Sequence, residues 1–207
     1  MSAASRAPVR SNRARRRTVL TTAGAAVATL LMSACSSGGT SGGGGDTNFV
    51  MGKDGISTAE KGERAAAPDL SGKTVNGGQL DVADYKGQVV VVNVWGSWCG
   101  PCRSEAQYFA KVSKQYEGKG VQFVGINTRD TSVQNAVAFE KQQGITYQSL
   151  YDPTGKLMLR FKRGTLNPQA VPSTLVLDRE GKIAARSLAA LSEDKLRKMI
   201  APVLAEK

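Results

Sequence analysis

Apolar residues are grouped into short continuous runs and helical stripes, and these patterns predict the secondary structure of most of the chain. Residues 89–94 (VVVVNV) and 121–126 (VQFVGI) are dominated by apolar and β-branched side chains. Runs of this length are typical of strands that are buried on both faces of a sheet. We therefore predict two interior strands at these positions.

Helical spacing of apolar residues follows each predicted strand. After Pro101 the apolar residues lie along one helical face, and glycines at 118 and 120 end the pattern. Residues 133–143 predict a second helix, which ends before a glycine. Ser192 is a good N-cap with two acidic residues directly after it, and it predicts a last helix that ends near residue 204.

The remaining pattern adds shorter elements. We expect a small hairpin over residues 70–80, a short helix over 152–161, and two strands over 174–177 and 182–188 that a turn connects. This alternation of strands and helices, without an internal repeat, is typical of the α/β class.

The N-terminus has the order of an export signal. An arginine-rich stretch ends at Arg17, an apolar stretch covers residues 18–34, and small residues precede Cys35. The apolar stretch is too short and too rich in Ala, Thr and Gly for a membrane span, which needs about 20 strongly apolar residues. We predict that residues 1–34 form a signal peptide. Residues 16–20 also resemble a twin-arginine signal, so the export route stays open.

Residues 31–35 (LMSAC) resemble a bacterial lipobox, which implies that Cys35 carries a lipid and becomes the mature N-terminus. The alternative is an ordinary cleaved signal that leaves Cys35 free. Residues 36–45 are nearly all Ser, Gly and Thr, which bury too little apolar surface to offset the entropy of ordering them. We therefore expect a lipidated Cys35 with a flexible linker over residues 35–63, and a folded domain over 64–207.

Composition narrows the chemistry. The 207 residues include no His, which excludes a histidine general base, a Cys–His nucleophile pair and histidine ligation of a metal or haem. The net charge of +11 is concentrated at the N-terminus, because six arginines precede Cys35 and no acid occurs before Asp46. The remainder has no basic stripe interleaved with aromatic residues, so we expect no nucleic-acid partner.

Two of the three cysteines, Cys99 and Cys102, lie in the sequence WCGPC, where the predicted strand gives way to a helix. A helix N-terminus favours an anion, so the Cys99 thiolate is stabilised and its pKa falls. Pro101 suits the first helical turn, and Cys102 lies one turn on, facing Cys99. We predict a redox-active pair that needs no metal and no cofactor. Metal ligation is the alternative, but one such pair supplies only half of a tetrahedral zinc set.

Glu105 falls on the apolar face of the helix that Cys102 begins. Partial desolvation there would raise the pKa of its carboxyl and suit it to exchange a proton with Cys102. The alternative is an acid that complements the dipole of the first helical turns.

The chain resembles the thioredoxin superfamily from about residue 67 onward, and more narrowly the TlpA/ResA branch of membrane-anchored thiol-disulfide oxidoreductases. The matching segments are APD at 67–69, YKG at 85–87, NVWGSWC at 93–99, CRSE at 102–105 and VPST at 171–174. The resemblance implies a thioredoxin-like fold, with a central mixed β-sheet flanked by helices and an N-terminal β-hairpin.

The same resemblance implies the roles of further residues. It makes Pro172 a cis-proline beside the cysteines, and it implies a substrate-binding surface. That surface comprises Trp98, Gly100, Pro101, Val171 and Pro172. Two positions depart from thioredoxin itself: Asn93 replaces a buried Asp, which favours the TlpA/ResA branch, and residues 188–190 (LAA) lack the usual glycine.

The function that the resemblance implies is an extracytoplasmic thiol-disulfide oxidoreductase, lipid-anchored to the outer face of a bacterial cell membrane. Cys99 and Cys102 would reduce disulfides in exported proteins, with apocytochrome c as the client that the family suggests, and a membrane protein would supply the electrons. An oxidising role is the first alternative. A peroxidase is the second alternative, but the P-x-x-x-T-x-x-C pattern of peroxiredoxins is absent around Cys99. A non-catalytic anchored binding lipoprotein is the third, but such a protein would not need the cysteine pair.

Overall fold

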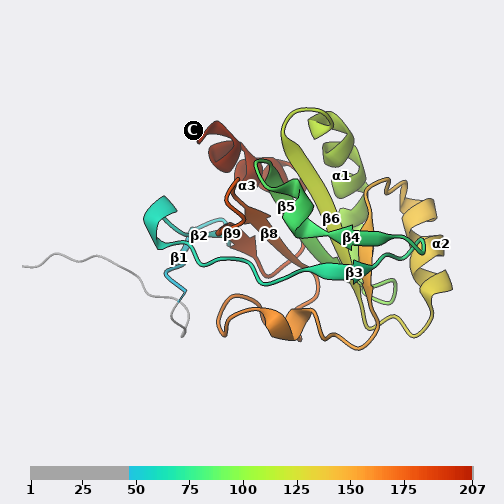
Figure 1. Cartoon of the computed structure of the whole chain (residues 1–207). Coiled ribbons are helices and arrows are strands. Elements are labelled where there is room, and N and C mark those ends of the chain that lie inside the picture. The colour runs from blue at the N-terminus through green and yellow to red at the C-terminus, as the bar shows by residue number, and fades with distance from the viewer. Residues whose placement is uncertain (1–46, 207) are drawn as a thin grey trace, which may run out of the picture. The chain divides into compact units, whose positions relative to one another are not determined.

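The computed structural model describes residues 47–206, which contain a mixed seven-stranded sheet (Figure 1). Its strands, in spatial order, are β1 (Val50–Met51), β2 (Ser57–Thr58), β9 (Ile183–Ser187), β8 (Ser173–Leu177), β5 (Val89–Trp95), β6 (Val121–Thr128) and β7 (Ser149–Asp152). Strands β5, β6 and β7 are parallel, whereas β8 runs antiparallel to β5 and β9 runs antiparallel to β8.

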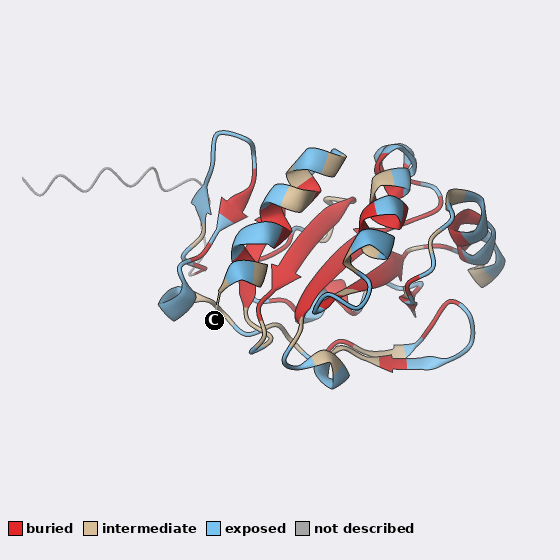
Figure 2. Ribbon diagram, turned by 90° about the horizontal axis from the view of Figure 1, so that it is seen from above, coloured by how far each residue is buried: buried red, intermediate tan, exposed pale blue. Residues whose placement is uncertain are grey.

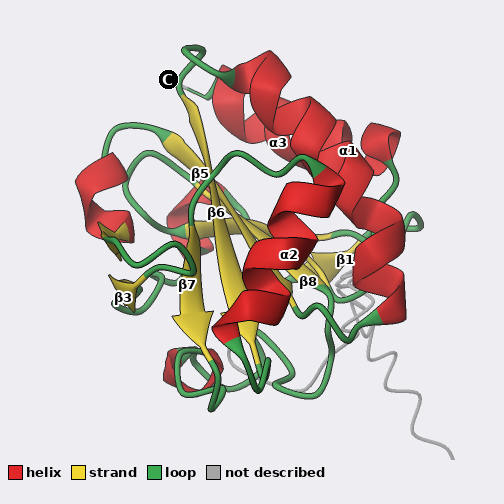
Figure 3. Cartoon of the chain, turned by 90° about the vertical axis from the view of Figure 1, so that its right-hand side faces the viewer, coloured by secondary structure: helices red, strands yellow, loops and turns green. Residues whose placement is uncertain are grey.

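Three α-helices cover one face of this sheet, as Figures 1 and 3 show from two sides. They are α1 (Gly100–Tyr116), α2 (Val133–Gln143) and α3 (Glu193–Ala205). Helices α1 and α2 each connect two neighbouring parallel strands, and right-handed crossovers in the same direction place both helices on the same face.

The opposite face is covered by shorter elements. The hairpin of β3 (Ser71–Lys73) and β4 (Gln79–Asp81) lies there, with the 3₁₀ helices η2 (Val82–Tyr85) and η3 (Met158–Arg160). A third 3₁₀ helix, η1 (Lys61–Glu63), precedes this region. The hairpin confirms the sequence-based prediction for residues 70–80.

The alternation of side chains between the two faces of β5 explains why nearly all of its residues are apolar. Val89 and Val91 pack against α1 and α3, whereas Val90, Val92 and Val94 pack against the hairpin side. Successive side chains of a strand point to opposite faces, so a strand between two covered faces is buried on both. Figure 2 shows these central strands as buried and the helices as buried only along the side that meets the sheet. The predicted strands and α-helices are confirmed, with α2 at the predicted residues 133–143.

The prediction of a helix over residues 152–161 is wrong for most of that range, because only Met158–Arg160 form a 3₁₀ turn. The Asp152 carboxylate accepts the backbone N–H groups of Lys156 (2.8 Å) and Leu157 (2.9 Å), which closes a local turn instead. Gly155 lies in this turn with a φ of 73°, a left-handed conformation that interrupts a helix.

The flexible linker expected over residues 35–63 does not extend over the described part of that range. Strand β1 pairs with β2, and β2 pairs with β9, so this segment extends the sheet. Ile56 is buried in the core, and the Phe49 ring lies 4.4 Å from the Arg186 guanidinium. Ile56 and Phe49 are apolar residues without a periodic pattern, so the sequence did not indicate that this segment packs against the domain. The predicted signal peptide, Cys35 and the Ser/Gly-rich stretch lie outside the described residues. Within residues 47–206, no helix combines the length and the hydrophobicity that crossing a bilayer requires.

Candidate active site

The two cysteines lie at the junction between β5 and α1, as the sequence predicted. Cys99 is the N-cap of α1, and its Sγ accepts the backbone N–H of Cys102 at 3.2 Å. The two sulfurs form a disulfide with an S–S distance of 2.03 Å. Cys99 is 3% exposed and Cys102 1%, while Gly100 and Pro101 between them are exposed. A backbone donor at a helix N-terminus stabilises a thiolate at Cys99, so this sulfur is suited to be the attacking group of the reduced pair.

The loop before β8, which contains Val171 and Pro172, also lies against Cys99. The Val171–Pro172 peptide bond is cis, as the resemblance implied. The Val171 carbonyl oxygen lies 3.6 Å from Cys99 Sγ, so a reduced Cys99 thiol can donate a hydrogen bond to it. Val171 is half-buried and packs against the apolar cluster that contains Cys99 and Cys102.

Glu105 is buried on α1, one turn after Cys102, and only 2% of it is exposed. One carboxylate oxygen accepts from the Asn93 side-chain amide at 2.9 Å, and the other accepts the backbone N–H of Leu191 at 2.9 Å. Burial raises the pKa of this carboxyl to about 7, although the hydrogen bonds from Leu191 and Asn93 partly counteract it. The structure thus buries Glu105, as the helical spacing predicted, and its carboxylate has two polar partners.

The same carboxylate holds the segment that lacks the usual glycine. Leu191 follows residues 188–190, and its hydrogen bond to Glu105 fixes the end of that segment to α1. Ser187 holds the other end, because its hydroxyl bonds to both the N–H and the carbonyl of Ala189.

Asp130 is a site residue that sequence reasoning missed. Its buried carboxylate accepts the Ser97 backbone N–H at 2.8 Å, the Ser97 hydroxyl, and the Asn127 amide at 2.5 Å. These bonds tie the turn before Cys99 to the loop after β6. The sequence signal that could have identified Asp130 is its position shortly after a buried parallel strand, because ligands and substrates usually bind at the carboxyl ends of such strands.

The two tryptophans have different environments. Trp98 is 49% exposed, its indole N–H donates to the Thr128 carbonyl at 3.1 Å, and the Arg129 guanidinium carbon lies 4.8 Å from its ring centroid. Trp95 is buried and stacks on Phe139 with ring centroids 4.7 Å apart. Trp98 therefore forms part of the surface next to Cys99, whereas Trp95 belongs to the core.

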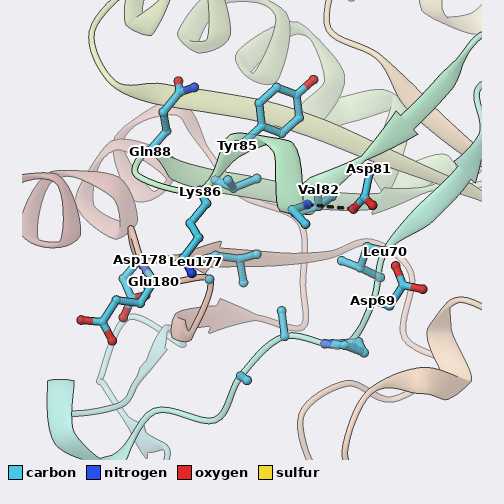
Figure 4. A pocket seen from close by; sticks show the side chains of 16 residues that line it. Asp69, Leu70, Asp81, Val82, Tyr85, Lys86, Gln88, Leu177, Asp178 and Glu180 are labelled. Atoms are coloured by element: carbon cyan, nitrogen blue, oxygen red, sulfur yellow. Dashed lines mark hydrogen bonds between the residues drawn. The ribbon is translucent and has the colours of Figure 1, made fainter.

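Residues 47–206 also bear on metal binding and on pockets away from the cysteines. No group of three or more Cys, Asp or Glu residues is arranged there to hold a metal ion. A pocket of about 440 Å³ is lined by residues 66–70, by η2 and by the β8–β9 turn, and Figure 4 shows its lining, which includes Leu70, Val82 and Leu177. None of its lining residues belongs to the cysteine site.

Comparison with known proteins agrees with this geometry. The Redoxin family model matches residues 60–200. The thiol-disulfide oxidoreductase ResA of Bacillus subtilis (strain 168) is 30% identical over 133 residues, which cover 64% of this chain and 68% of ResA.

Solved structures give the same result. A DsbF homologue from Corynebacterium diphtheriae is 36% identical with a TM-score of 0.68, and the match covers 77% of this chain and 99% of that one. A secreted thiol-disulfide isomerase from Corynebacterium glutamicum is 29% identical with a TM-score of 0.69, over 79% of this chain and 100% of that one. The chain therefore belongs to the Redoxin family and is a ResA-like thiol-disulfide oxidoreductase with a thioredoxin-like fold.

Proposed function

We propose that this protein reduces disulfides in exported proteins, with Cys99 as the attacking sulfur and Cys102 as the resolving sulfur. The observation that carries the proposal is the position of Cys99 as the N-cap of α1, with a backbone N–H directed at its Sγ and the cis-proline loop beside it. Gly100 and Pro101 between the cysteines resemble those of reducing thioredoxins.

The reaction is two successive thiol–disulfide exchanges. The Cys99 thiolate attacks one sulfur of the client disulfide, the client S–S bond breaks, and the other client sulfur leaves as a thiolate that takes up a proton. Cys102 then loses its proton and attacks Cys99, which releases the second client thiolate and forms the Cys99–Cys102 disulfide. Two electrons have passed to the client, and a dithiol of a membrane protein must restore the reduced pair.

Glu105 is the proposed acceptor of the Cys102 proton. A thiol in an apolar setting has a raised pKa, so Cys102 resolves slowly unless a nearby base takes its proton. A carboxyl with a pKa of about 7 is poised to exchange a proton near neutral pH, and Glu105 lies on the same face of α1 as Cys102.

Replacing Glu105 with Gln keeps the size of the side chain and removes the titrating group. We expect the variant to form mixed disulfides normally and to release its clients about tenfold more slowly near pH 7, because each unit of thiol pKa changes the thiolate fraction about tenfold. Stopped-flow measurement of client release after mixed-disulfide formation tests this. A variant with wild-type release and a changed thermal stability would make Glu105 a purely structural acid.

The proposed client surface consists of Trp98, Gly100, Pro101, Val171 and Pro172. Gly100 and Pro101 are exposed on one side of Cys99, and an ideal Cβ at Gly100 meets no atom within 4 Å, so a client chain can approach there. On the other side, the loop before β8 offers backbone to which an extended client segment can add.

The proposed location is the extracytoplasmic face of a bacterial cell membrane, with Cys35 as the lipid anchor. The lipobox resemblance of residues 31–35 supports the anchor, and the description of the Corynebacterium glutamicum relative as secreted supports the compartment. Apocytochrome c is the client suggested by the TlpA/ResA resemblance, and other exported disulfide proteins are the second candidate.

An oxidising role uses the same residues in reverse, and the isomerase description of a solved relative favours testing it. The reduction potential of the Cys99–Cys102 pair, measured by equilibration with glutathione, decides between the two. We expect a value near that of thioredoxin, about −270 mV, and a value near −120 mV would make the protein an oxidant. Insulin reduction with dithiothreitol as donor provides the activity control, since a non-catalytic binding protein gives no turnover.

A further inference from the structure

Arg129 contributes a positive charge to the surface beside Cys99. Its guanidinium carbon lies 4.8 Å from the centroid of the Trp98 ring, and Trp98 directly precedes Cys99. One guanidinium nitrogen donates to the Gln169 side-chain oxygen at 3.4 Å, and Gln169 lies two residues before Val171. The guanidinium thus lies between the two loops that flank the attacking cysteine.

The backbone at Arg129 is fixed in a conformation that arginine rarely adopts. Its φ is 56°, in the left-handed region, which costs a non-glycine residue about 1 kcal/mol or more. The neighbouring contacts maintain it: the Arg129 N–H donates to the Asp152 carbonyl at 3.1 Å, and the next residue, Asp130, is anchored to Ser97. These contacts fix the backbone from which the Arg129 side chain extends, and they thereby restrict the position of its guanidinium.

The guanidinium retains most of its capacity to bind an anion. It has five N–H donors: the Nε–H is buried without a partner, and the contact to Gln169 is long and uses only one of the other four. Several other arginines of residues 47–206 have acidic partners: Arg64 pairs with Glu206, Arg160 with Asp69 and Arg197 with Glu193. No ion pair of Arg129 occurs in that part of the chain. The adjacent Asp130 carboxylate is occupied by Ser97 and Asn127.

We infer that Arg129, stacked on Trp98, binds an acidic side chain of the client close to the cysteine that Cys99 attacks. This inference rests on the proposed function. A guanidinium in a stacked, fixed position presents a planar fork that matches a carboxylate. Trp98 directly precedes Cys99, so we place the acidic residue within about three positions of the attacked cysteine, since an extended client segment rises about 3.3 Å per residue. Arg129 is then a specificity-determining residue, and the client class is a disulfide flanked by Asp or Glu.

The test uses three disulfide-linked peptides that differ only in the residue two positions after the attacked cysteine, which is Glu, Gln or Lys. The full chain, purified in detergent and reduced, is mixed with each peptide, and the second-order rate of peptide thiol release is measured. We expect the Glu peptide to react about fivefold faster than the Gln peptide, since about 1 kcal/mol is the upper range for a partly exposed ion pair. The Lys peptide should be the slowest.

Arg129→Gln should reduce the ratio of the Glu and Gln rates to about one, and Arg129→Lys should retain part of it. A change in Cys99 thiolate stability alters all three rates alike, so the ratio reports recognition alone. Arg197→Gln is the matched control, because it removes the same charge far from the site. Arg197 contacts Gln115, which lies about 20 Å along α1 from the cysteines, so this variant should keep the wild-type ratio.

The outcomes separate this inference from the function on which it rests. A wild-type protein that reduces none of the peptides contradicts the proposed reductase. Equal wild-type rates for the three peptides, or a ratio that survives in Arg129→Gln, overturn the inference and leave Arg129 as a support for Trp98. The salt dependence of the wild-type ratio is a second measurement that needs no variant: the ratio should fall toward one at about 1 M salt, where charges are screened beyond about 3 Å.

Discussion

The buried Glu105 carboxyl should make the stability of the folded protein depend on pH between about 4.5 and 7. Ionising it in the folded protein costs about 3 kcal/mol more than in the unfolded chain, because its pKa lies near 7 rather than at 4.5 and each pH unit is worth about 1.4 kcal/mol. The folded state then binds more protons than the unfolded state in this window. The contribution of the protonated Glu105 carboxyl to the stability of the folded protein is complete below pH 4.5 and is lost as the pH rises through 7.

Glu105→Gln should remove this dependence at a small cost. A glutamine amide offers one acceptor oxygen, so it keeps only one of the two donors, Asn93 Nδ2 or Leu191 N–H, and losing the other costs about 1 kcal/mol. The variant should be less stable than the wild type near pH 4 and about 2 kcal/mol more stable near pH 8. The two stability curves should cross between about pH 5 and 6.

Urea unfolding of the oxidised protein from pH 4 to 8.5 measures the two curves. The disulfide keeps the cysteines from titrating, and the difference between variant and wild type cancels the contribution of Glu140, whose pKa burial also raises. Glu117→Gln, at an exposed position at the other end of α1, is the matched control and should follow the wild type. Parallel curves for Glu105→Gln and the wild type would refute the reasoning, since they would mean that Glu105 ionises without penalty.

Three further changes test other parts of the molecule. Cys102→Ala should trap Cys99 in mixed disulfides with clients, visible on non-reducing gels, and trapping by the reverse variant would exchange the two roles. Asp130→Ala should destabilise the protein by about 1–3 kcal/mol in thermal unfolding, because it leaves the Ser97 N–H and hydroxyl without their buried acceptor, and an unchanged midpoint would contradict this. Cys35→Ser should move the protein from the membrane to the soluble fraction or block its processing, and unchanged membrane retention would argue against the lipid anchor.

The sequence was sufficient wherever local pattern and local chemistry coincide. Residues 89–94 are apolar on both faces, so their strand could be placed without any knowledge of its partners. The WCGPC segment follows shortly after the end of that strand and contains the start of a helix, and this context alone places Cys99 at the helix N-terminus. Glu105 could be assigned to the buried face because helical spacing relates it directly to Cys102.

The parts that could not be predicted depend on contacts between distant segments. Asp130 acts on Ser97, 33 residues earlier, and nothing in its own neighbourhood indicates that partner. Strands β1 and β2 have two residues each, too few for a period-2 pattern, and they form because β9 offers an unpaired edge. The contact of Arg129 with Trp98 likewise depends on where two loops meet in space.

The pairing of β2 with β9 also determines which strand edges of the sheet other molecules can reach. An uncovered strand edge is a template for adding strands from other molecules, and proteins commonly blunt such edges with very short strands. Here β2 and the two-residue β1 cover β9, while the N–H of Val75 donates to the Ser149 carbonyl at the opposite edge, along β7. A truncated chain that starts at residue 64 would uncover the backbone of β9, so we expect such a fragment to aggregate by adding strands at this edge.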